Sequence, residues 1–233
     1  MKIYITGVSK GIGKALAEYF LKAGNSVIGI GRGHMINHPN FSLLHCDLRK
    51  LDEAKKIKFE DDETGVMLIN NAGVIGNIQR ISDQETPDMA EVMTVNTLAP
   101  MYLCQQFLKQ LPTSTNLTIV NISSGAANRA IPSWASYCAS KVALDRFSET
   151  IYLEELEKNR NIRVYSISPG IIDTAMQEKI RATEPNDFSS LNNFRELKEK
   201  GELQSVETTV HKLISLLQLP YNGNVICSLK EMN

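Results

Sequence analysis

Tyr137 and Lys141 are four residues apart, and Ser124 lies thirteen residues before the tyrosine. A spacing of four places the tyrosine and the lysine on one face of a helix, one turn from each other. A tyrosine can donate a proton to an oxyanion, and a nearby ammonium lowers its ordinarily high pKa because it favours the phenolate. A serine hydroxyl can hydrogen-bond a carbonyl oxygen and stabilise the charge that develops there. These residue types suit acid–base chemistry at a carbonyl group.

A second chemical feature is the glycine-rich stretch TGVSKGIG at residues 6–13. It follows a candidate strand and precedes a candidate helix, which is the context in which such loops bind dinucleotides. Glycine lets the backbone approach a ligand, and the free N–H groups of a helix N-terminus favour phosphate. The alternative is a strand-to-helix turn without a ligand. We expect a dinucleotide pyrophosphate to be bound by Gly7, Ser9, Lys10, Gly11, Ile12 and Gly13.

Lys10 and Arg32 indicate which dinucleotide is bound. NAD-binding folds often place an acid at the end of the second strand to hold the ribose hydroxyls. Here the sequence is IGIGRG, with Arg32 at that position and Lys10 inside the glycine loop. Two cations suit a 2′-phosphate, which an acid would repel. The sequence therefore predicts NADP, with NADPH preferred over NADH; the alternative is that both are solvated surface charges.

The elements that must position these residues alternate between strand and helix. Apolar runs predict seven strands, at residues 2–6, 26–31, 41–47, 66–70, 116–123, 162–168 and 224–229. Helices are expected at 12–24, 50–59, 87–111 (in two pieces around Pro100), 134–159 and 205–219. Continuous apolar strands are typical of a parallel sheet buried on both faces. We predict one α/β domain over residues 1–233, with a Rossmann-type, doubly wound, seven-stranded parallel sheet in three α/β/α layers.

Composition excludes several other classes of protein. The net charge is −1, so no basic field points to nucleic acid or to an anionic membrane. No apolar run approaches the roughly 20 residues that cross a bilayer, and MKIYITG lacks the features of a secretion signal. The four cysteines form no C-x-x-C pair, so we expect no metal site and reduced thiols in a cytoplasmic protein.

Four motifs occur in order: T-G-x-x-x-G-x-G from Thr6, N-N-A-G from Asn70, S-x12-Y-x-x-x-K from Ser124 and P-G-x-x-x-T from Pro169. Each is weak alone, but the set, which covers Thr6 to Thr174, resembles the classical short-chain dehydrogenase/reductase family. The resemblance implies a catalytic tetrad of Asn96, Ser124, Tyr137 and Lys141. It also implies that Lys141 holds the nicotinamide ribose and that Asn96 anchors a water that relays protons.

The same resemblance implies further cofactor contacts. These are Asp47, Leu48, Asn71, Ala72, Gly73, Tyr137, Lys141, Pro169, Gly170, Ile172 and Thr174. Simpler roles remain open for some residues. Ser124 is alternatively a turn residue, with Ser123 its nearest rival, and Asp47 is alternatively a helix cap. Tyr137 is alternatively a half-buried helix tyrosine, and Asn96 a polar residue that breaks a helix.

Within the family, TGVSKGIG, ISSGAA and SPGIIDTAMQ resemble the sepiapterin reductase and bacterial benzil reductase group. The resemblance implies that NADPH reduces a ketone or diketone. Sepiapterin reductase holds its pterin with an aspartate on the last strand, where this chain has Cys227, so an uncharged carbonyl substrate is favoured. The alternative function is a non-catalytic sensor of NADP(H) on the same fold.

The charged stretch at 173–204 is expected to form a flap over the substrate, the alternative being a plain pair of surface helices. Trp134, Met176 and Phe194 flank the site in sequence and are candidate pocket residues, the alternative being ordinary packing. The family usually forms dimers or tetramers through its two long helices. We therefore expect a homodimer or homotetramer through 87–111 and 134–159.

Overall fold

Seven strands pair in parallel into one sheet, with the order β3-β2-β1-β4-β5-β6-β7. The structure is a computed structural model and describes residues 1–232. The strands are β1 (Lys2–Thr6), β2 (Ser26–Gly31), β3 (Phe41–His45), β4 (Val66–Asn70), β5 (Leu117–Ile122), β6 (Ile162–Ser168) and β7 (Ile226–Ser228). Every residue of β4 and β5 is buried, as expected for central strands covered on both faces. The predicted seven-stranded parallel sheet is confirmed.

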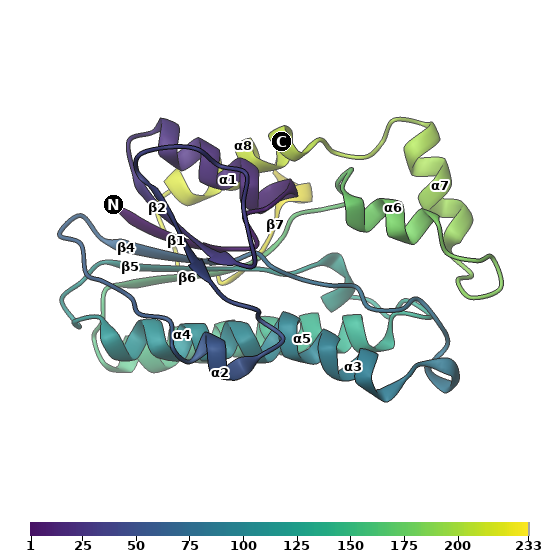
Figure 1. The fold of residues 1–233 in the computed structure, drawn as a ribbon, viewed down its shortest axis with the longest axis horizontal. Coiled ribbons are helices and arrows are strands. Elements are labelled where there is room, and N and C mark those ends of the chain that lie inside the picture. The colour runs from purple at the N-terminus through teal and green to yellow at the C-terminus, as the bar shows by residue number, and fades with distance from the viewer. Residues whose placement is uncertain (233) are drawn as a thin grey trace.

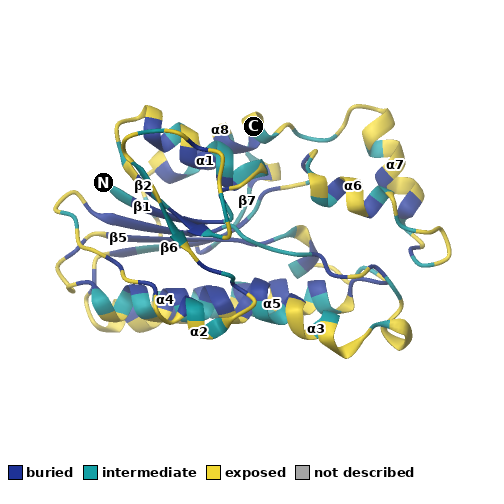
Figure 2. Cartoon of the chain, in the orientation of Figure 1, coloured by how far each residue is buried: buried dark blue, intermediate teal, exposed yellow. Residues whose placement is uncertain are grey.

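Helices cover both faces of this sheet (Figure 1). α1 (Gly11–Lys22) and α8 (Val206–Gln218) lie on one face, and α4 (Ala99–Gln110) and α5 (Ala135–Glu157) lie on the other. The short α2 (Leu51–Ala54) and α3 (Thr86–Met93) flank α4 and α5, while α6 (Ala175–Arg181) and α7 (Leu191–Glu199) extend beyond the sheet. The central strands of the sheet are mostly dark blue in Figure 2, between two half-exposed helical layers. This is the three-layer α/β/α arrangement.

Each helical layer closes its own hydrophobic core against the sheet. On one side Leu16 and Leu213 pack with Ile5 of β1. On the other side Phe107 packs with Leu68 of β4. These side chains are fully buried, so each core contributes hydrophobic stabilisation in proportion to the apolar area removed from water.

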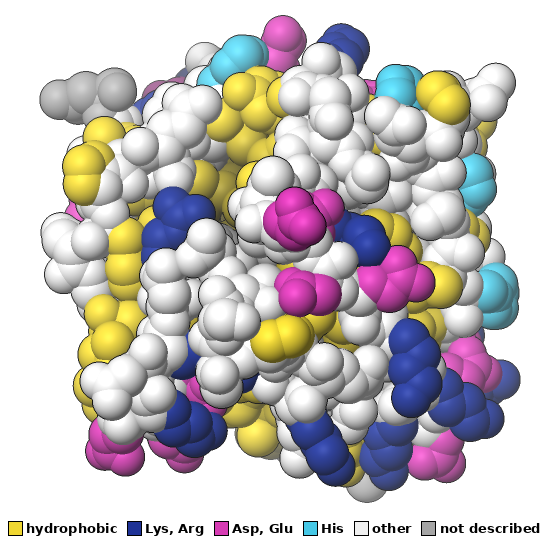
Figure 3. Space-filling view, turned by 90° about the vertical axis from the view of Figure 1, so that its left-hand side faces the viewer, with side chains coloured by type: hydrophobic (Ala, Val, Ile, Leu, Met, Phe, Trp, Pro, Cys, Tyr) yellow, Lys and Arg dark blue, Asp and Glu magenta, His cyan; other side chains and the backbone are white. Residues whose placement is uncertain are grey.

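Parallel pairing places the loops that follow β1 to β6 at one edge of the sheet. That edge collects the residues that the sequence singled out: Gly7 after β1, Arg32 after β2, Asp47 after β3, Asn71 after β4, Ser124 after β5 and Pro169 after β6. Ligands of open α/β sheets bind at this carboxyl edge. The opposite end, seen in Figure 3, shows basic and acidic side chains scattered among one another. Among residues 1–232, no helix is long and apolar enough to cross a membrane.

Two predicted helices differ from the structure. The helix expected at 50–59 is only the four-residue α2, because Phe59 turns into the core, where its ring lies 4.8 Å from that of Tyr4 and 5.2 Å from that of Phe107. The helix expected at 87–111 is divided, but by a π-helical turn at Thr94–Leu98 that precedes Pro100. Such turns widen a helix locally and often occur at functional sites.

Candidate active site

Ser124, Tyr137 and Lys141 come together where β5 ends and α5 begins. α5 starts at Ala135, so Tyr137 lies in its first turn and Lys141 in the next. Lys141 donates from Nζ to the main-chain oxygen of Ile122 at 2.8 Å, and the same nitrogen lies 5.8 Å from the centre of the Tyr137 ring. Ser124 lies close enough to Tyr137 for its hydroxyl to lower the pKa of the phenol. The three residues that the sequence assigned to acid–base chemistry therefore form one connected group.

Ser124 has a structural role as well as a possible chemical one. Its Oγ accepts a hydrogen bond from the backbone N–H of Ala126 at 3.1 Å, which caps the short 3-10 turn at Gly125–Ala127. Ser124 is therefore a turn residue, as the alternative interpretation states, and it also contacts Tyr137. Ser123, the alternative serine, directly precedes Ser124 and is buried. Its hydroxyl has no hydrogen-bond partner among the described residues.

Burial shifts the pKa values of both titratable groups of this cluster. Burial raises the pKa of Tyr137 above its ordinary value, and the Ser124 hydrogen bond opposes this shift. Burial also lowers the pKa of Lys141 to about 8, opposed by the negative charge of Asp145 one turn further along α5. The net shift of the Tyr137 pKa is therefore upward, opposite to the direction expected from a nearby ammonium, because burial disfavours the charged phenolate.

Asn96 occupies the π-helical turn, so it does interrupt the helix as the alternative proposed. Its side chain forms a reciprocal pair with Val74, accepting from the backbone N–H at 2.8 Å and donating to the backbone oxygen at 2.8 Å, and it also donates to Ser140 Oγ at 3.1 Å. A Cβ placed on Gly73 would lie 3.4 Å from Asn96 Oδ1 and 3.7 Å from Lys141 Nζ. Asn96 thus holds the loop after β4 close to the lysine, while its role in binding a water stays a prediction.

The glycine loop needs glycine for two different reasons. Gly7 and Gly11 have φ values of +74° and +59°, which side chains rarely adopt. Gly13 has no such strain, but a Cβ there would lie 2.3 Å from Asn71 Nδ2 and 2.4 Å from the backbone oxygen of Gly7. Asn71 Nδ2 donates to the backbone oxygens of Thr6 at 3.0 Å and Gly7 at 3.2 Å, so its amide is fixed in that place.

A cleft of about 650 Å³ runs along the carboxyl edge next to this loop. Of the predicted cofactor residues it is lined by Gly7, Ser9, Lys10, Arg32, Asp47, Leu48, Asn71, Ala72 and Gly73. The glycine cradle, the open volume and the two cations fit a phosphorylated dinucleotide. The helix-cap alternative for Asp47 is wrong, because α2 begins at Leu51 with Lys50 at its cap position.

The other predicted cofactor residues do not line this cleft. Thr174 is close to the glycine loop, with its Cγ2 4.0 Å from a Cβ placed on Gly11. Ile172 pairs with Gln204 in an isolated bridge, and Gly170, with a φ of +90°, faces the same glutamine. The residues in this second group are Gly11, Ile12, Gly13, Tyr137, Lys141, Pro169, Gly170, Ile172 and Thr174.

Residues 173–204 form α6 and α7 and pack over Tyr137. Trp134 is the centre of this packing: its ring centroid lies 5.6 Å from that of Tyr137, 5.5 Å from that of Phe188 and 5.4 Å from that of Phe194. The Trp134 and Phe188 rings are stacked, with 15° between their planes. Asp173 ties the two helices together by bridging Lys198 of α7 at 2.5 Å and Arg181 of α6 at 3.6 Å.

The three candidate pocket residues have different surroundings. Trp134 and Phe194 belong to the aromatic cluster, and Phe194 also lines a separate hollow of about 440 Å³ beside residues 129–132. Met176 lines the cofactor cleft. Cys227 lies on β7 and packs against the core that contains Tyr165, on the α1 and α8 side of the sheet.

Arg49 and Phe188 are among the residues of this region that sequence reasoning missed. Arg49 lines the cleft two residues after Asp47, and its only sequence signal is a cation next to a predicted adenine contact. Phe188 stacks on Trp134 from within a stretch without a recognisable pattern. Its position depends on how α6 and α7 fold back over α5, which spacing alone does not show.

Comparison with known proteins agrees with this geometry. Residues 1–185 match the family model described as short chain dehydrogenase. The chain belongs to the short-chain dehydrogenase family. A benzil reductase ((S)-benzoin forming) of Bacillus subtilis is 35% identical over 242 residues, covering 99% of each chain. Sepiapterin reductase of Bos taurus is 35% identical over 157 residues, which cover 66% of this chain and 57% of that one.

The fold of this short-chain dehydrogenase is also that of solved structures. One is a short-chain dehydrogenase from Burkholderia cenocepacia in complex with NADP, which is 25% identical. Its TM-score is 0.73, over 97% of this chain and 86% of that one. Family membership makes the chain an oxidoreductase that uses a nicotinamide cofactor, and the predicted resemblance to the benzil and sepiapterin reductases is confirmed.

Proposed function

We propose that this short-chain dehydrogenase is an NADPH-dependent carbonyl reductase that converts a ketone or diketone to an alcohol. The observation that supports this best is the connected group of Ser124, Tyr137 and Lys141 beside a cleft lined by Lys10 and Arg32. All four residues of the expected tetrad are present, which a non-catalytic sensor would not require.

The residues divide the reaction between them. The reduced nicotinamide, when bound, supplies the hydride. Tyr137 donates the proton from its hydroxyl to the carbonyl oxygen, and its raised pKa keeps that proton in place at neutral pH. Ser124 hydrogen-bonds the same oxygen while negative charge develops on it. Lys141, held by the Ile122 oxygen, supplies positive charge next to the phenol and a donor for the ribose.

Lys10 and Arg32 support NADPH as the preferred cofactor. Both line the cleft, one from the glycine loop and one from the end of β2, where an acid would favour NADH. Neither forms an ion pair among residues 1–232, so their charges remain for a phosphate.

The aromatic cluster supports a substrate with an aryl group. All three rings are neutral: Trp134 packs edge-to-face against the Tyr137 ring, and Phe188 and Phe194 pack against Trp134. Aromatic rings pack favourably on such surfaces, in stacked or edge-to-face arrangements. The benzil reductases among the relatives act on an aromatic diketone, as their name states, and we propose the same class of substrate here. In this proposal residues 173–204 are the flap that closes over it.

The α4 and α5 face supports self-association. Leu153 and Leu156 of α5 are 60% and 45% exposed, and Val142 of the same helix is 50% exposed, so this helix carries several exposed apolar side chains. We propose a homodimer or homotetramer that covers these side chains. A Leu153→Glu variant is expected to elute as a smaller species than the wild type in size-exclusion chromatography with light scattering; an unchanged mass would contradict this interface.

The substrate proposal is tested with Trp134→Ala. We expect the KM for an aromatic 1,2-diketone to rise about tenfold, since the ring loses its stacking partner, while the KM for a small aliphatic diketone stays within about twofold. Unchanged KM for both substrates would show that Trp134 is ordinary packing. Equal increases for both would show general damage to the site.

A further inference from the structure

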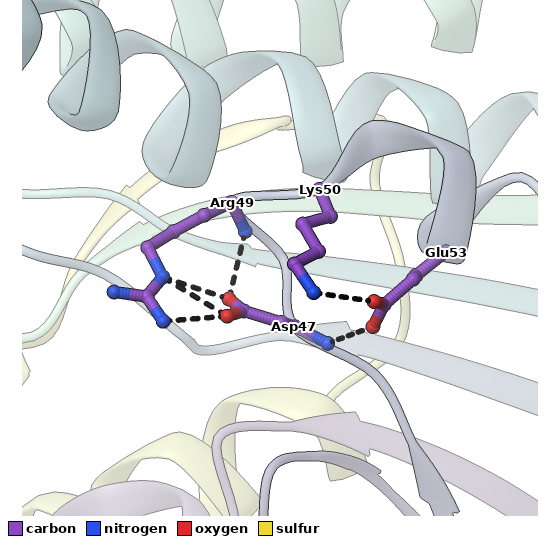
Figure 4. A network of polar contacts seen from close by, with 4 residues as sticks. All are labelled: Asp47, Arg49, Lys50 and Glu53. Carbon is purple, nitrogen blue, oxygen red and sulfur yellow. Dashed lines mark hydrogen bonds and ion pairs between the residues drawn. The ribbon is translucent and has the colours of Figure 1, made fainter.

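Asp47 and Arg49 form a closely fitted ion pair inside the proposed cofactor cleft (Figure 4). The Arg49 side chain donates from Nε to both carboxylate oxygens, at 2.9 and 3.1 Å, and its terminal Nη2 lies 2.5 Å from Oδ2. The backbone N–H of Arg49 donates to Oδ1 at 3.1 Å as well. The Nε and Nη2 edge of the guanidinium therefore faces the carboxylate.

The backbone around this pair is fixed from the other side. The N–H of Asp47 donates to Glu53 Oε2 at 2.8 Å, and Lys50 Nζ lies 3.3 Å from the other oxygen of Glu53 (Figure 4). Asp47 therefore has a fixed backbone position and a largely buried side chain, of which 13% is exposed. Its carboxylate is hydrogen-bonded to the Arg49 side chain in the cleft.

Asp47 is a predicted contact of the adenine, but its negative charge lies in the same cleft as Arg32. Hydrogen bonds from Arg49 lower the pKa of Asp47 to about 2, with a smaller contribution from the charge of Arg32, so the group is ionised at neutral pH. Arg32 is the cation that we assign to the 2′-phosphate. A carboxylate within range of Arg32 would repel that phosphate and compete for its charge.

Arg49 offsets the negative charge of Asp47. Lys10, Arg32 and Asp47 together bring a net charge of +1 to the cleft and Arg49 adds one more, while Glu91 and Lys179, which also line the cleft, offset each other. Because the carboxylate oxygens already accept from Arg49, Asp47 is screened from an incoming anion. We propose that Arg49 is a selectivity-determining residue that permits binding of a 2′-phosphorylated adenosine, and that it acts by neutralising Asp47.

The inference rests on the proposed cofactor, and binding of two adenosine fragments tests it without turnover. Isothermal titration with adenosine 2′,5′-bisphosphate and adenosine 5′-monophosphate gives the selectivity for the 2′-phosphate directly. We expect Arg49→Gln to weaken binding of the bisphosphate about tenfold, with the monophosphate changed by less than about threefold. The double variant Asp47→Asn with Arg49→Gln should regain bisphosphate affinity to within about threefold of the wild type.

Each other outcome has a definite meaning. If the double variant binds the bisphosphate as weakly as Arg49→Gln, Arg49 does not act through Asp47 and the inference is wrong. If Arg49→Gln loses both ligands equally, it has no selectivity role. A wild type without preference for the bisphosphate would overturn the proposed cofactor along with this inference. Arg146→Gln is the matched control, since Arg146 is an exposed arginine that pairs with Glu149 at 2.9 Å, and it should bind like the wild type.

Discussion

Lys141 Nζ lies 2.8 Å from the main-chain oxygen of Ile122, which ties the helix that bears Tyr137 to the strand that leads to Ser124. This bond fixes the lysine where burial alone would disfavour its charge. It also explains why the three residues remain in register although they come from two elements.

The pH dependence of reduction should report Lys141. Burial lowers its pKa to about 8, so the side chain is charged below that pH and loses its proton above it, while Tyr137, with a raised pKa, stays protonated. We expect kcat/KM for the carbonyl substrate to be constant at lower pH and to fall as the pH rises through about 8. A Lys141→Arg variant, whose guanidinium does not titrate, should lack this limb in whatever activity remains. A wild-type profile that stays flat up to about pH 10 would contradict the assignment.

Tyr137→Phe removes the proposed proton donor and little else, because the ring still packs against Trp134. We expect kcat to fall by about 10²–10⁴-fold, the usual contribution of a positioned acid. NADPH affinity, measured by titration, should remain within about threefold. A variant that keeps near-wild-type kcat would show that another group donates the proton.

Gly13→Ala tests the packing of the glycine loop. Its Cβ would meet Asn71 Nδ2 and the Gly7 oxygen at 2.3–2.4 Å, so the loop or Asn71 must shift. We expect a loss of about 1–3 kcal/mol in the free energy of unfolding, measured by denaturant titration. Gly33→Ala is the control, since a Cβ there has no neighbour within 4 Å, and it should stay within about 0.5 kcal/mol. Equal effects of the two changes would show that the contact at Gly13 is not restrictive.

A buried ion pair lies at the C-terminal end of α5, away from Tyr137 and Lys141 at its N-terminal end. Arg160 Nη1 lies 3.1 Å from Glu155 Oε2, and the guanidinium also donates to the backbone oxygens of Leu108 and Leu111, at 2.9 and 2.6 Å. Arg160→Ala leaves the carboxylate buried without this partner, so we expect a loss of about 3–5 kcal/mol.

The control for this prediction is Arg146→Ala, which breaks an exposed pair with Glu149 and should cost less than about 1 kcal/mol. Unfolding by denaturant compares the two variants directly. A loss below about 1 kcal/mol for Arg160→Ala would mean that Lys158, 2.5 Å from Glu155 Oε1, is a sufficient partner.

Local patterns predicted most of the sheet. Runs such as VMLIN are apolar at every position, which marks central parallel strands, and β4 begins and ends at the predicted residues. The motifs also placed Ser124, Tyr137 and Lys141 at one site, because strand ends in a parallel sheet share an edge. Where an element depends on tertiary contacts the prediction failed: Phe59 leaves the expected helix for the core beside Phe107.

The finer features of the site depend on packing between distant segments. Phe188 stacks on Trp134 although the two residues are 54 positions apart in the sequence, and no spacing rule connects them. The net rise in the pKa of Tyr137 follows from burial by α6 and α7, which sequence motifs do not report. The pairing of Asp47 with Arg49 is local but requires the exact turn after β3.

The central claim is NADPH-dependent reduction of a carbonyl. The most direct measurement is steady-state kcat/KM for NADPH and for NADH with a saturating aromatic 1,2-diketone, followed by the absorbance of the reduced nicotinamide, with the alcohol product identified by chromatography. The account predicts turnover to the hydroxyketone and a preference for NADPH of at least about tenfold, from the two cations at Lys10 and Arg32. Equal or better use of NADH, or tight NADPH binding without turnover of any ketone or diketone, would contradict it.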